Sequence, residues 1–184
     1  MDHTETIVEI KNIINPNFIK KVIPFIKNKA RKNLNTFDGL KKDVRNVKGY
    51  DMVNELIDNP TDIFYWNYIK KEIERLYFFY KIKFPKMASD KLDQIGLLKY
   101  DVGGKYEVHT DHHTTTPRHL SIIMNLNNKY EGGDLIFTDQ KDKEIKRFKL
   151  DKGSIIFFPS NFMYAHSIQP ITKGTRYSIV AWLR

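Results

Sequence analysis

Residues 104–111 of the chain read Gly104-Lys105-Tyr106-Glu107-Val108-His109-Thr110-Asp111. We predict that residues 105–111 form a strand, preceded by a turn that contains Gly104. His109 and Asp111 are then two positions apart on that strand. Alternate residues of a strand point to the same face, so this spacing places an imidazole beside a carboxylate. The two side chains are candidates for binding one cation.

Two further residues downstream complete a pattern of metal chemistry. His166 lies in Phe162-Met163-Tyr164-Ala165-His166-Ser167, and Arg176 follows ten residues later. Two histidines and one carboxylate on one face of a metal leave the remaining positions open, an arrangement typical of non-haem Fe(II) oxygenases. Arg176 supplies a planar cation suited to bidentate binding of a carboxylate-bearing co-substrate.

The order of motifs extends this pattern over half of the chain. Glu131-Gly132-Gly133-Asp134-Leu135 and Gly153-Ser154-Ile155-Ile156-Phe157-Phe158-Pro159 lie between the two histidines. From about Leu97 to the C-terminus, the chain resembles the Fe(II)- and 2-oxoglutarate-dependent dioxygenases of the prolyl 4-hydroxylase type. The arginine at position 176 and the leucine at 135 are closer to the hypoxia-sensing and bacterial enzymes than to the collagen type, which commonly has lysine and threonine there.

The resemblance implies an oxidoreductase that uses Fe(II), with 2-oxoglutarate and O2 as co-substrates. It would hydroxylate a substrate C–H bond, most simply at a prolyl residue of a peptide or protein, and release succinate and CO2. Ascorbate binding, as a reductant, is a further expectation from the procollagen-proline 4-dioxygenases. The metal ligands would be His109, Asp111 and His166.

The resemblance also assigns the co-substrate contacts. Arg176 would pair with the distal carboxylate of 2-oxoglutarate, and Ser178, on the same face, would assist. Tyr100 stands where related hydroxylases have a tyrosine that bonds the co-substrate. Asn125 stands where hypoxia-type enzymes have a second such tyrosine, and it is the fourth candidate. Tyr106, Arg118 and Trp182 occupy positions on the substrate side, although packing or surface roles fit them equally well.

Hydrophobic periodicity predicts two amphipathic helices in the first half of the chain. One begins at Pro16 after a short strand over residues 6–14, and the other covers residues 62–80. Short strands and turns follow from Gln94 onward. We therefore predict a mainly β, α+β fold: a double-stranded β-helix, or cupin-like jelly roll, buttressed by N-terminal helices.

We expect a single domain over residues 1–184. Residues 1–93 would supply the helical support, the first strands and a substrate-side loop at about 33–50, and residues 94–184 the catalytic core. The loop is rich in turn-forming residues, with a strand expected near Val44–Val47. It would either close over a peptide or be a disordered connection.

Composition excludes several classes of site. The chain has 184 residues, of which 41% are hydrophobic and 29% charged, and it has no cysteine. Disulfides, thiolate metal sites and cysteine nucleophiles are therefore excluded. No apolar run is long enough to span a bilayer, and the first residues do not resemble a signal peptide. A soluble, cytoplasmic protein is the expectation.

The formal net charge of +9 raises the question of an acidic partner. Nucleic acid is one such partner, but the basic residues are scattered along the chain, which favours a lysine-rich surface. The oligomeric state stays open. Other substrates also stay open: a free amino acid, another peptidyl side chain or a nucleobase. A non-oxygenase metal- or sugar-binding cupin-like module is an alternative of a different class.

Overall fold

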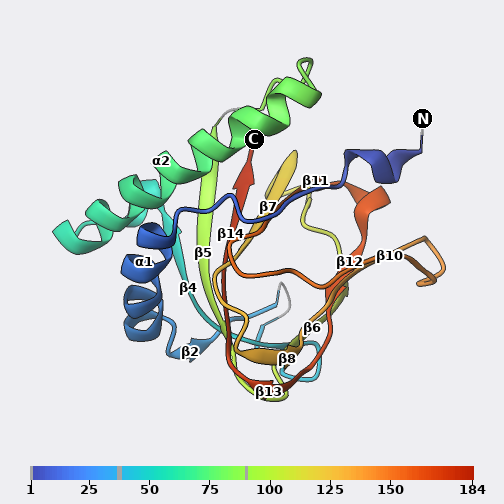
Figure 1. The fold of residues 1–184 in the computed structure, drawn as a ribbon. Helices are drawn as coiled ribbons and strands as arrows, with labels where there is room; N and C mark the ends of the chain where they lie inside the picture. Colours follow the sequence, from blue (N-terminus) through green and yellow to red (C-terminus); the bar gives the residue numbers. More distant parts are fainter. Residues whose placement is uncertain (1, 37–38, 90) are drawn as a thin grey trace.

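The computed structural model describes residues 2–36, 39–89 and 91–184. Two of the residues in the predicted 33–50 loop, at 37 and 38, lie outside this description. Two antiparallel sheets face each other, and both helices cover the outer face of the larger one (Figure 1). This is the predicted double-stranded β-helix with N-terminal helical support.

The larger sheet has seven strands, all in antiparallel pairs. In spatial order they are β1 (Val8–Ile10), β11 (Ile155–Pro159), β7 (Leu120–Asn125), β14 (Arg176–Leu183), β5 (Leu92–Tyr100), β4 (Lys48–Val53) and β2 (Lys32–Asn33). The N-terminal half of the chain therefore contributes to both edges of this sheet.

The smaller sheet has five strands, again antiparallel. They are, in order, β10 (Glu144–Phe148), β9 (Leu135–Thr138), β12 (His166–Ile168), β6 (Lys105–His109) and β3 (Arg45–Asn46). A two-stranded ribbon, β8 (Tyr130–Gly132) with β13 (Ile171–Gly174), closes one end. The sequence did not predict this ribbon.

The helices begin at asparagine caps followed by proline. α1 (Pro16–Lys29) starts where Asn15 accepts a hydrogen bond from the Asn17 amide at 2.8 Å. α2 (Pro60–Lys83) starts where Asn59 accepts one from the Asp62 amide at 2.9 Å, so it is longer than the predicted 62–80. Proline at the first helical position loses no intrahelical hydrogen bond. Short 3-10 helices lie at His3–Thr6, Asn54–Leu56 and Phe162–Tyr164.

The larger sheet is buried on both faces, which explains its continuous apolar strands. On β11, Ile155 and Phe157 face the helices, whereas Ile156 and Phe158 face the space between the sheets. The first cluster fixes the helices to the sheet, and the second surrounds the inner cavity. Within the described ranges, no helix is both long and apolar enough to cross a membrane.

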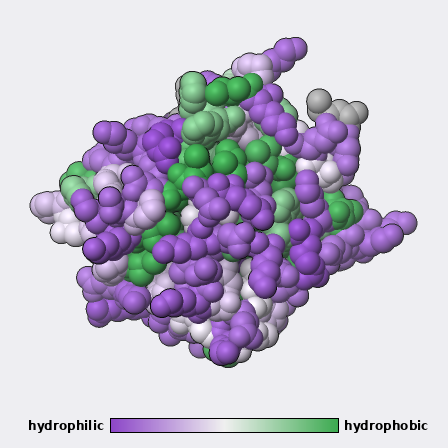
Figure 2. All heavy atoms as spheres, in the orientation of Figure 1, coloured by the Kyte–Doolittle hydropathy of each residue, from purple (hydrophilic) through white to green (hydrophobic). Residues whose placement is uncertain are grey.

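The molecular surface is mostly hydrophilic in the orientation of Figure 1, with hydrophobic residues gathered where α2 crosses the molecule (Figure 2). The exposed apolar side chains of this helix are Ile63, Phe64, Phe78, Phe79 and Ile82.

Three predicted boundaries need correction. The strand predicted at residues 6–14 is only Val8–Ile10, because a 3-10 helix takes up residues 3–6. The loop predicted at 33–50 is shorter, since β4 already begins at Lys48 and pairs with β5. The strand predicted at 105–111 ends at His109, where the chain bends away from its neighbours. Asp111 therefore does not reach its place through strand parity.

Candidate active site

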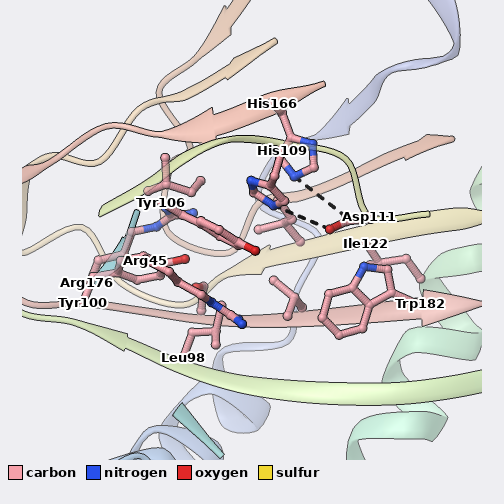
Figure 3. A pocket seen from close by; sticks show the side chains of 14 residues that line it. Arg45, Leu98, Tyr100, Tyr106, His109, Asp111, Ile122, His166, Arg176 and Trp182 are labelled. Atoms are coloured by element: carbon pink, nitrogen blue, oxygen red, sulfur yellow. Dashed lines mark ion pairs between the residues drawn. The ribbon is translucent and has the colours of Figure 1, made fainter. Parts of the chain in front are cut away.

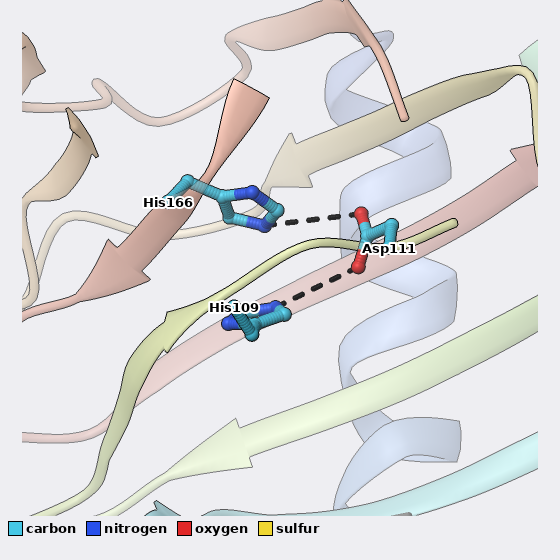
Figure 4. Close-up of side chains that lie close together, drawn as sticks. All are labelled: His109, Asp111 and His166. Atoms are coloured by element: carbon cyan, nitrogen blue, oxygen red, sulfur yellow. Dashed lines mark ion pairs between the residues drawn. The ribbon is translucent and has the colours of Figure 1, made fainter. Parts of the chain in front are cut away.

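His109 and Asp111, two positions apart, meet His166 from a distant part of the sequence at the space between the two sheets. His109 ends β6 and His166 begins β12, and the two residues are directly paired across these strands. Asp111 lies just beyond the end of β6. Its Oδ1 is 3.6 Å from His109 Nε2, and its Oδ2 is 3.8 Å from His166 Nε2 (Figure 4). One ligand atom from each of the three residues can be chosen so that all lie within 4.8 Å of one another.

Both imidazoles are held in the orientation that a metal ligand needs. His109 Nδ1 lies 2.8 Å from the Glu107 carbonyl oxygen, and His166 Nδ1 lies 3.0 Å from the Tyr164 carbonyl oxygen. A carbonyl accepts only, so each Nδ1 carries the proton and each Nε2 lone pair points at the shared site. Such backbone contacts are typical of metal-binding histidines.

The protonation states suit a cation. Burial, together with the nearby His109, lowers the pKa of His166 to about 4, which keeps its imidazole neutral at neutral pH. Burial alone would raise the pKa of Asp111, but His166, His109 and a hydrogen bond from Ser121 together hold it below its usual range. Two imidazoles and one carboxylate are a ligand set that fits a divalent metal.

A narrow cavity extends from these ligands into the space between the sheets (Figure 3). Its apolar walls come from both sheets: Leu98, Ile122, Ile123, Ile168 and Val180. Tyr100 and Arg176 lie at one end and Trp182 at the other. Among the predicted co-substrate residues, Tyr100, Arg176 and Ser178 line this cavity.

The Arg176 end of the cavity holds an unpaired positive charge. Arg176 is only 1% exposed, and its Nε and Nη1 donate to Asn125 Oδ1 at 3.2 Å and the Gly133 carbonyl at 3.3 Å. Its Nη2 and the nearby Ser178 Oγ are buried without a hydrogen-bond partner in the described chain. A buried charge is costly unless paired. A ligand that bears a carboxylate would suit these donors in charge and in hydrogen bonding.

Asn125, the fourth predicted co-substrate residue, is not among the residues that line the cavity. Its amide oxygen accepts hydrogen bonds from Arg176 Nε and, at 3.2 Å, from the Tyr130 hydroxyl, while its amide nitrogen donates at 2.9 Å to the Leu150 carbonyl. Asn125 therefore anchors Arg176 from behind, and its contact with the co-substrate stays a prediction.

A second, open groove adjoins the metal ligands. The three predicted substrate-side residues all line it, and Tyr106 and Trp182 also reach the inner cavity. The ring of Tyr106 stacks on His109 with centroids 3.6 Å apart, and the guanidinium of Arg118 lies 3.7 Å from the centroid of Trp182. All three therefore lie close to the metal ligands.

Arg45 is a site residue that the sequence did not identify. It lines both hollows, and its guanidinium lies 4.8 Å from the centre of the Tyr106 ring. The predicted strand near Val44–Val47 was the available signal. It forms as β3, where Arg45 pairs with Tyr106 of β6 and so shares its face of the sheet.

Comparisons with known proteins agree with this geometry. Residues 95–184 match the family model of the 2OG-Fe(II) oxygenase superfamily. A PKHD-type hydroxylase of Gloeothece citriformis is 29% identical over 100 residues, which cover 51% of this chain and 44% of that protein. The match thus spans less than half the length of this relative.

Solved structures match over nearly the whole chain. A prolyl-4-hydroxylase of Pseudomonas putida has a TM-score of 0.74 at 13% identity, covering 97% of this chain and 92% of its own. A prolyl hydroxylase of Trichoplax adhaerens, solved with a peptide fragment of the hypoxia-inducible factor oxygen degradation domain, has a TM-score of 0.78 at 16% identity, with coverages of 98% and 84%. At these identities the likeness establishes the fold.

The superfamily implies Fe(II), 2-oxoglutarate and O2, and the three ligands and the unpaired Arg176 are chemically suited to the first two. Residues 95–184 of the chain are therefore identified by their match to the 2OG-Fe(II) oxygenase superfamily, with a PKHD-type hydroxylase among the relatives.

Proposed function

We propose that the chain is an Fe(II)- and 2-oxoglutarate-dependent hydroxylase that acts on a prolyl residue of a peptide or protein and releases succinate and CO2. One observation carries the proposal: three metal ligands converge at a cavity whose far end holds a buried arginine without a carboxylate partner in the described chain. The cation site and the anion site thus face the same enclosed space.

Each residue has a role in this proposal. His109, Asp111 and His166 would hold the metal. Arg176 and Ser178 bind the distal carboxylate of 2-oxoglutarate, and Tyr100, 2% exposed, limits water access beside them. Bound Fe(II) supplies the chemistry: one oxygen atom of O2 enters the substrate C–H bond and the other enters succinate as 2-oxoglutarate loses CO2.

A peptide or protein substrate is supported by the open groove beside the ligands. Residues of the 33–50 region, including Asn35, Thr36 and Arg45, form one wall of it. The chain would then work as one domain, with residues 1–93 supplying this wall and residues 94–184 the metal and co-substrate contacts. That the Trichoplax neighbour was solved with a peptide favours the same class of substrate here.

The alternatives have less support. A nucleobase would need an open aromatic face, but Trp182 is 7% exposed and Tyr106 already contacts His109 and Arg45. A non-oxygenase sugar- or metal-binding module would give the buried Arg176 no anion to pair with. A free amino acid would leave most of the open groove unused.

The test is succinate release in the presence of Fe(II), 2-oxoglutarate and proline-containing peptides, with product mass analysis. His166→Ala should abolish turnover, and His112→Ala, a change of the same type at an exposed residue outside the ligand set, should retain it. Turnover that survives in the His166 variant would contradict the proposal. A mass gain of one oxygen on a residue other than proline would correct only the substrate.

A further inference from the structure

We infer that the substrate carries a carboxylate close to the hydroxylated carbon, so that the target lies in an acidic segment of a peptide or protein. This inference rests on the proposed function and names the chemistry of its substrate. It comes from two guanidinium groups, Arg45 and Arg118, that line the groove beside the metal ligands.

Both guanidinium groups have hydrogen-bonding capacity left over. The Nε atoms of Arg45 and Arg118 are buried and have no hydrogen-bond partner in the described chain. Arg45 Nη1 donates to the Asn35 carbonyl at 2.8 Å, and Arg118 Nη2 donates to Gln94 Oε1 at 2.6 Å. Both of these acceptors are uncharged, so neither guanidinium is neutralised through its hydrogen bonds.

The charge of the groove is positive once its acidic residues are considered. Among its described lining residues, the only carboxylates are Asp51 and Asp111. Asp111 belongs to the metal site, where a divalent cation more than balances it. Asp93 lies outside the lining, 4.0 Å from Arg118 Nε, and forms a closer pair with Arg184 at 2.5 Å. One aspartate therefore faces two arginines in the groove.

The two arginines are also held in place before a ligand arrives. The guanidinium carbon of Arg118 lies over the Trp182 ring, 3.7 Å from its centroid, and the Arg118 side chain is 15% exposed. Arg45 lies over Tyr106, which in turn stacks on the metal ligand His109. A guanidinium fixed in this way loses little conformational entropy when it binds a carboxylate. The stack through Tyr106 also places the Arg45 charge beside the metal centre.

A polypeptide fits the groove better than a nucleic acid does. Polyanion binding uses cations along a strand of phosphates and aromatic faces open to bases. Here Asp51 lies in the same groove as the two cations, and the faces of Tyr106 and Trp182 already contact Arg45, His109 and Arg118. A single Asp or Glu side chain near the target residue matches two localised cations.

The experiment compares three fluorescent proline-containing peptides on the chain loaded with Mn(II) and 2-oxoglutarate. The residues that flank proline are Asp and Glu, Asn and Gln, or Lys in otherwise identical peptides. We expect the acidic peptide to bind about tenfold more tightly than the amide peptide, since a hydrogen bond to a charged group contributes about 1.5–3 kcal/mol. The preference should weaken as salt is added.

Substitutions of the two arginines test whether they cause the preference for the acidic peptide. Arg45→Gln and Arg118→Gln should each reduce the acidic preference, and the double variant should lose it. Arg45→Glu should shift binding toward the lysine peptide, an outcome that misfolding cannot produce. Arg31→Gln is the matched control, because Arg31 is exposed and its guanidinium donates a hydrogen bond to Asn28, outside the groove. Unchanged binding of 2-oxoglutarate shows that each variant is folded.

Equal binding of the three peptides would overturn the inference, and so would a preference that persists in the double variant. A single-stranded oligonucleotide that displaces the acidic peptide at equal concentration would overturn it in favour of a phosphate ligand. A failure of the proposed function would look different. If the acidic peptide binds more tightly but no peptide gives succinate release, the hydroxylase proposal is rejected and the acidic-segment inference is kept. Succinate release at equal KM for all three peptides would reject the acidic segment alone.

Discussion

The hydroxyl of Ser121 donates a hydrogen bond to Asp111 Oδ2 at 2.7 Å. Ser121 has one proton to give, so the 2.8 Å contact between its oxygen and Ser160 Oγ is donated by Ser160. Both serines are 1% exposed. These two buried hydrogen bonds, from Ser160 to Ser121 and from Ser121 to Asp111, thus fix the orientation of the Asp111 carboxylate. They take the place of strand pairing, because β6 already ends at His109.

The first prediction concerns the hydrogen bond from Ser121 to Asp111. Ser121→Ala should weaken metal binding about 10–100-fold, the usual effect of losing a partner of a metal ligand. Titration of Mn(II) into the metal-free chain measures it. Ser178→Ala, an equal change on the neighbouring strand with no contact to Asp111, should leave the metal affinity unchanged. An unaltered affinity in the Ser121 variant would show that Asp111 needs no support from this hydroxyl.

The second prediction concerns the buried arginine. Arg176→Gln should weaken 2-oxoglutarate binding about 30-fold or more, because removing one partner of a buried charge pair costs about 2–5 kcal/mol. Calorimetric titration of the Mn(II)-loaded chain gives the dissociation constant. Arg147→Gln, at an exposed arginine on β10 paired with Glu144, is the control. Equal affinity in both variants would place the co-substrate carboxylate elsewhere.

The third prediction concerns acid stability. Asp62 is fully buried at the start of α2, with Lys29 Nζ at 2.7 Å and the Tyr50 hydroxyl donating at 2.5 Å. Burial alone would raise the pKa of Asp62, but the hydrogen bonds from Lys29, Tyr50 and Asn59 hold it below the usual value. The resulting stabilisation is present above the unfolded-state pKa of about 3.9 and is lost as pH falls through the lower folded-state pKa.

Asp62→Asn should therefore lower the free energy of unfolding at pH 7 by about 1–3 kcal/mol. The difference from the native chain should shrink as the pH falls below about 4. Urea unfolding at several pH values tests both statements. Asp58→Asn, at an exposed aspartate just before the helix, should change stability little at any of these pH values. A pH-independent loss in the Asp62 variant would mean that packing, not charge, is responsible.

The fourth prediction concerns Gly132, the last residue of β8 in the β8–β13 ribbon. Gly132 has φ of +76°, and a Cβ there would overlap the Pro170 carbonyl oxygen. Gly39 also has positive φ, at +99°, but a Cβ would meet nothing within 4 Å. Both alanine variants share backbone strain of about 1 kcal/mol, and Gly132→Ala adds the overlap. Its melting temperature should fall clearly further than that of Gly39→Ala. Equal decreases in melting temperature would show that the β8–β13 ribbon shifts to accommodate the added Cβ at little cost.

Much of the site could be predicted from local sequence. The spacing of His109 and Asp111, followed in order by His166 and Arg176, indicates the metal and anion chemistry without any structure. The helices were predictable because apolar residues repeat with helical period, and an asparagine–proline pair indicated the start of the first helix. These are local properties, set by backbone geometry and by which face each residue can bury.

Other features depend on contacts between segments that are distant in sequence. His166 meets His109 only because β12 pairs with β6 in one register, and Arg45 enters the groove only because β3 pairs with the same strand. Asn125 lies behind Arg176 because β7 and β14 are neighbours. The sequence by itself determined which chemical groups the site has. Strand register, which depends on long-range packing, decided where each group points, and so which ones support the metal, the co-substrate and the substrate.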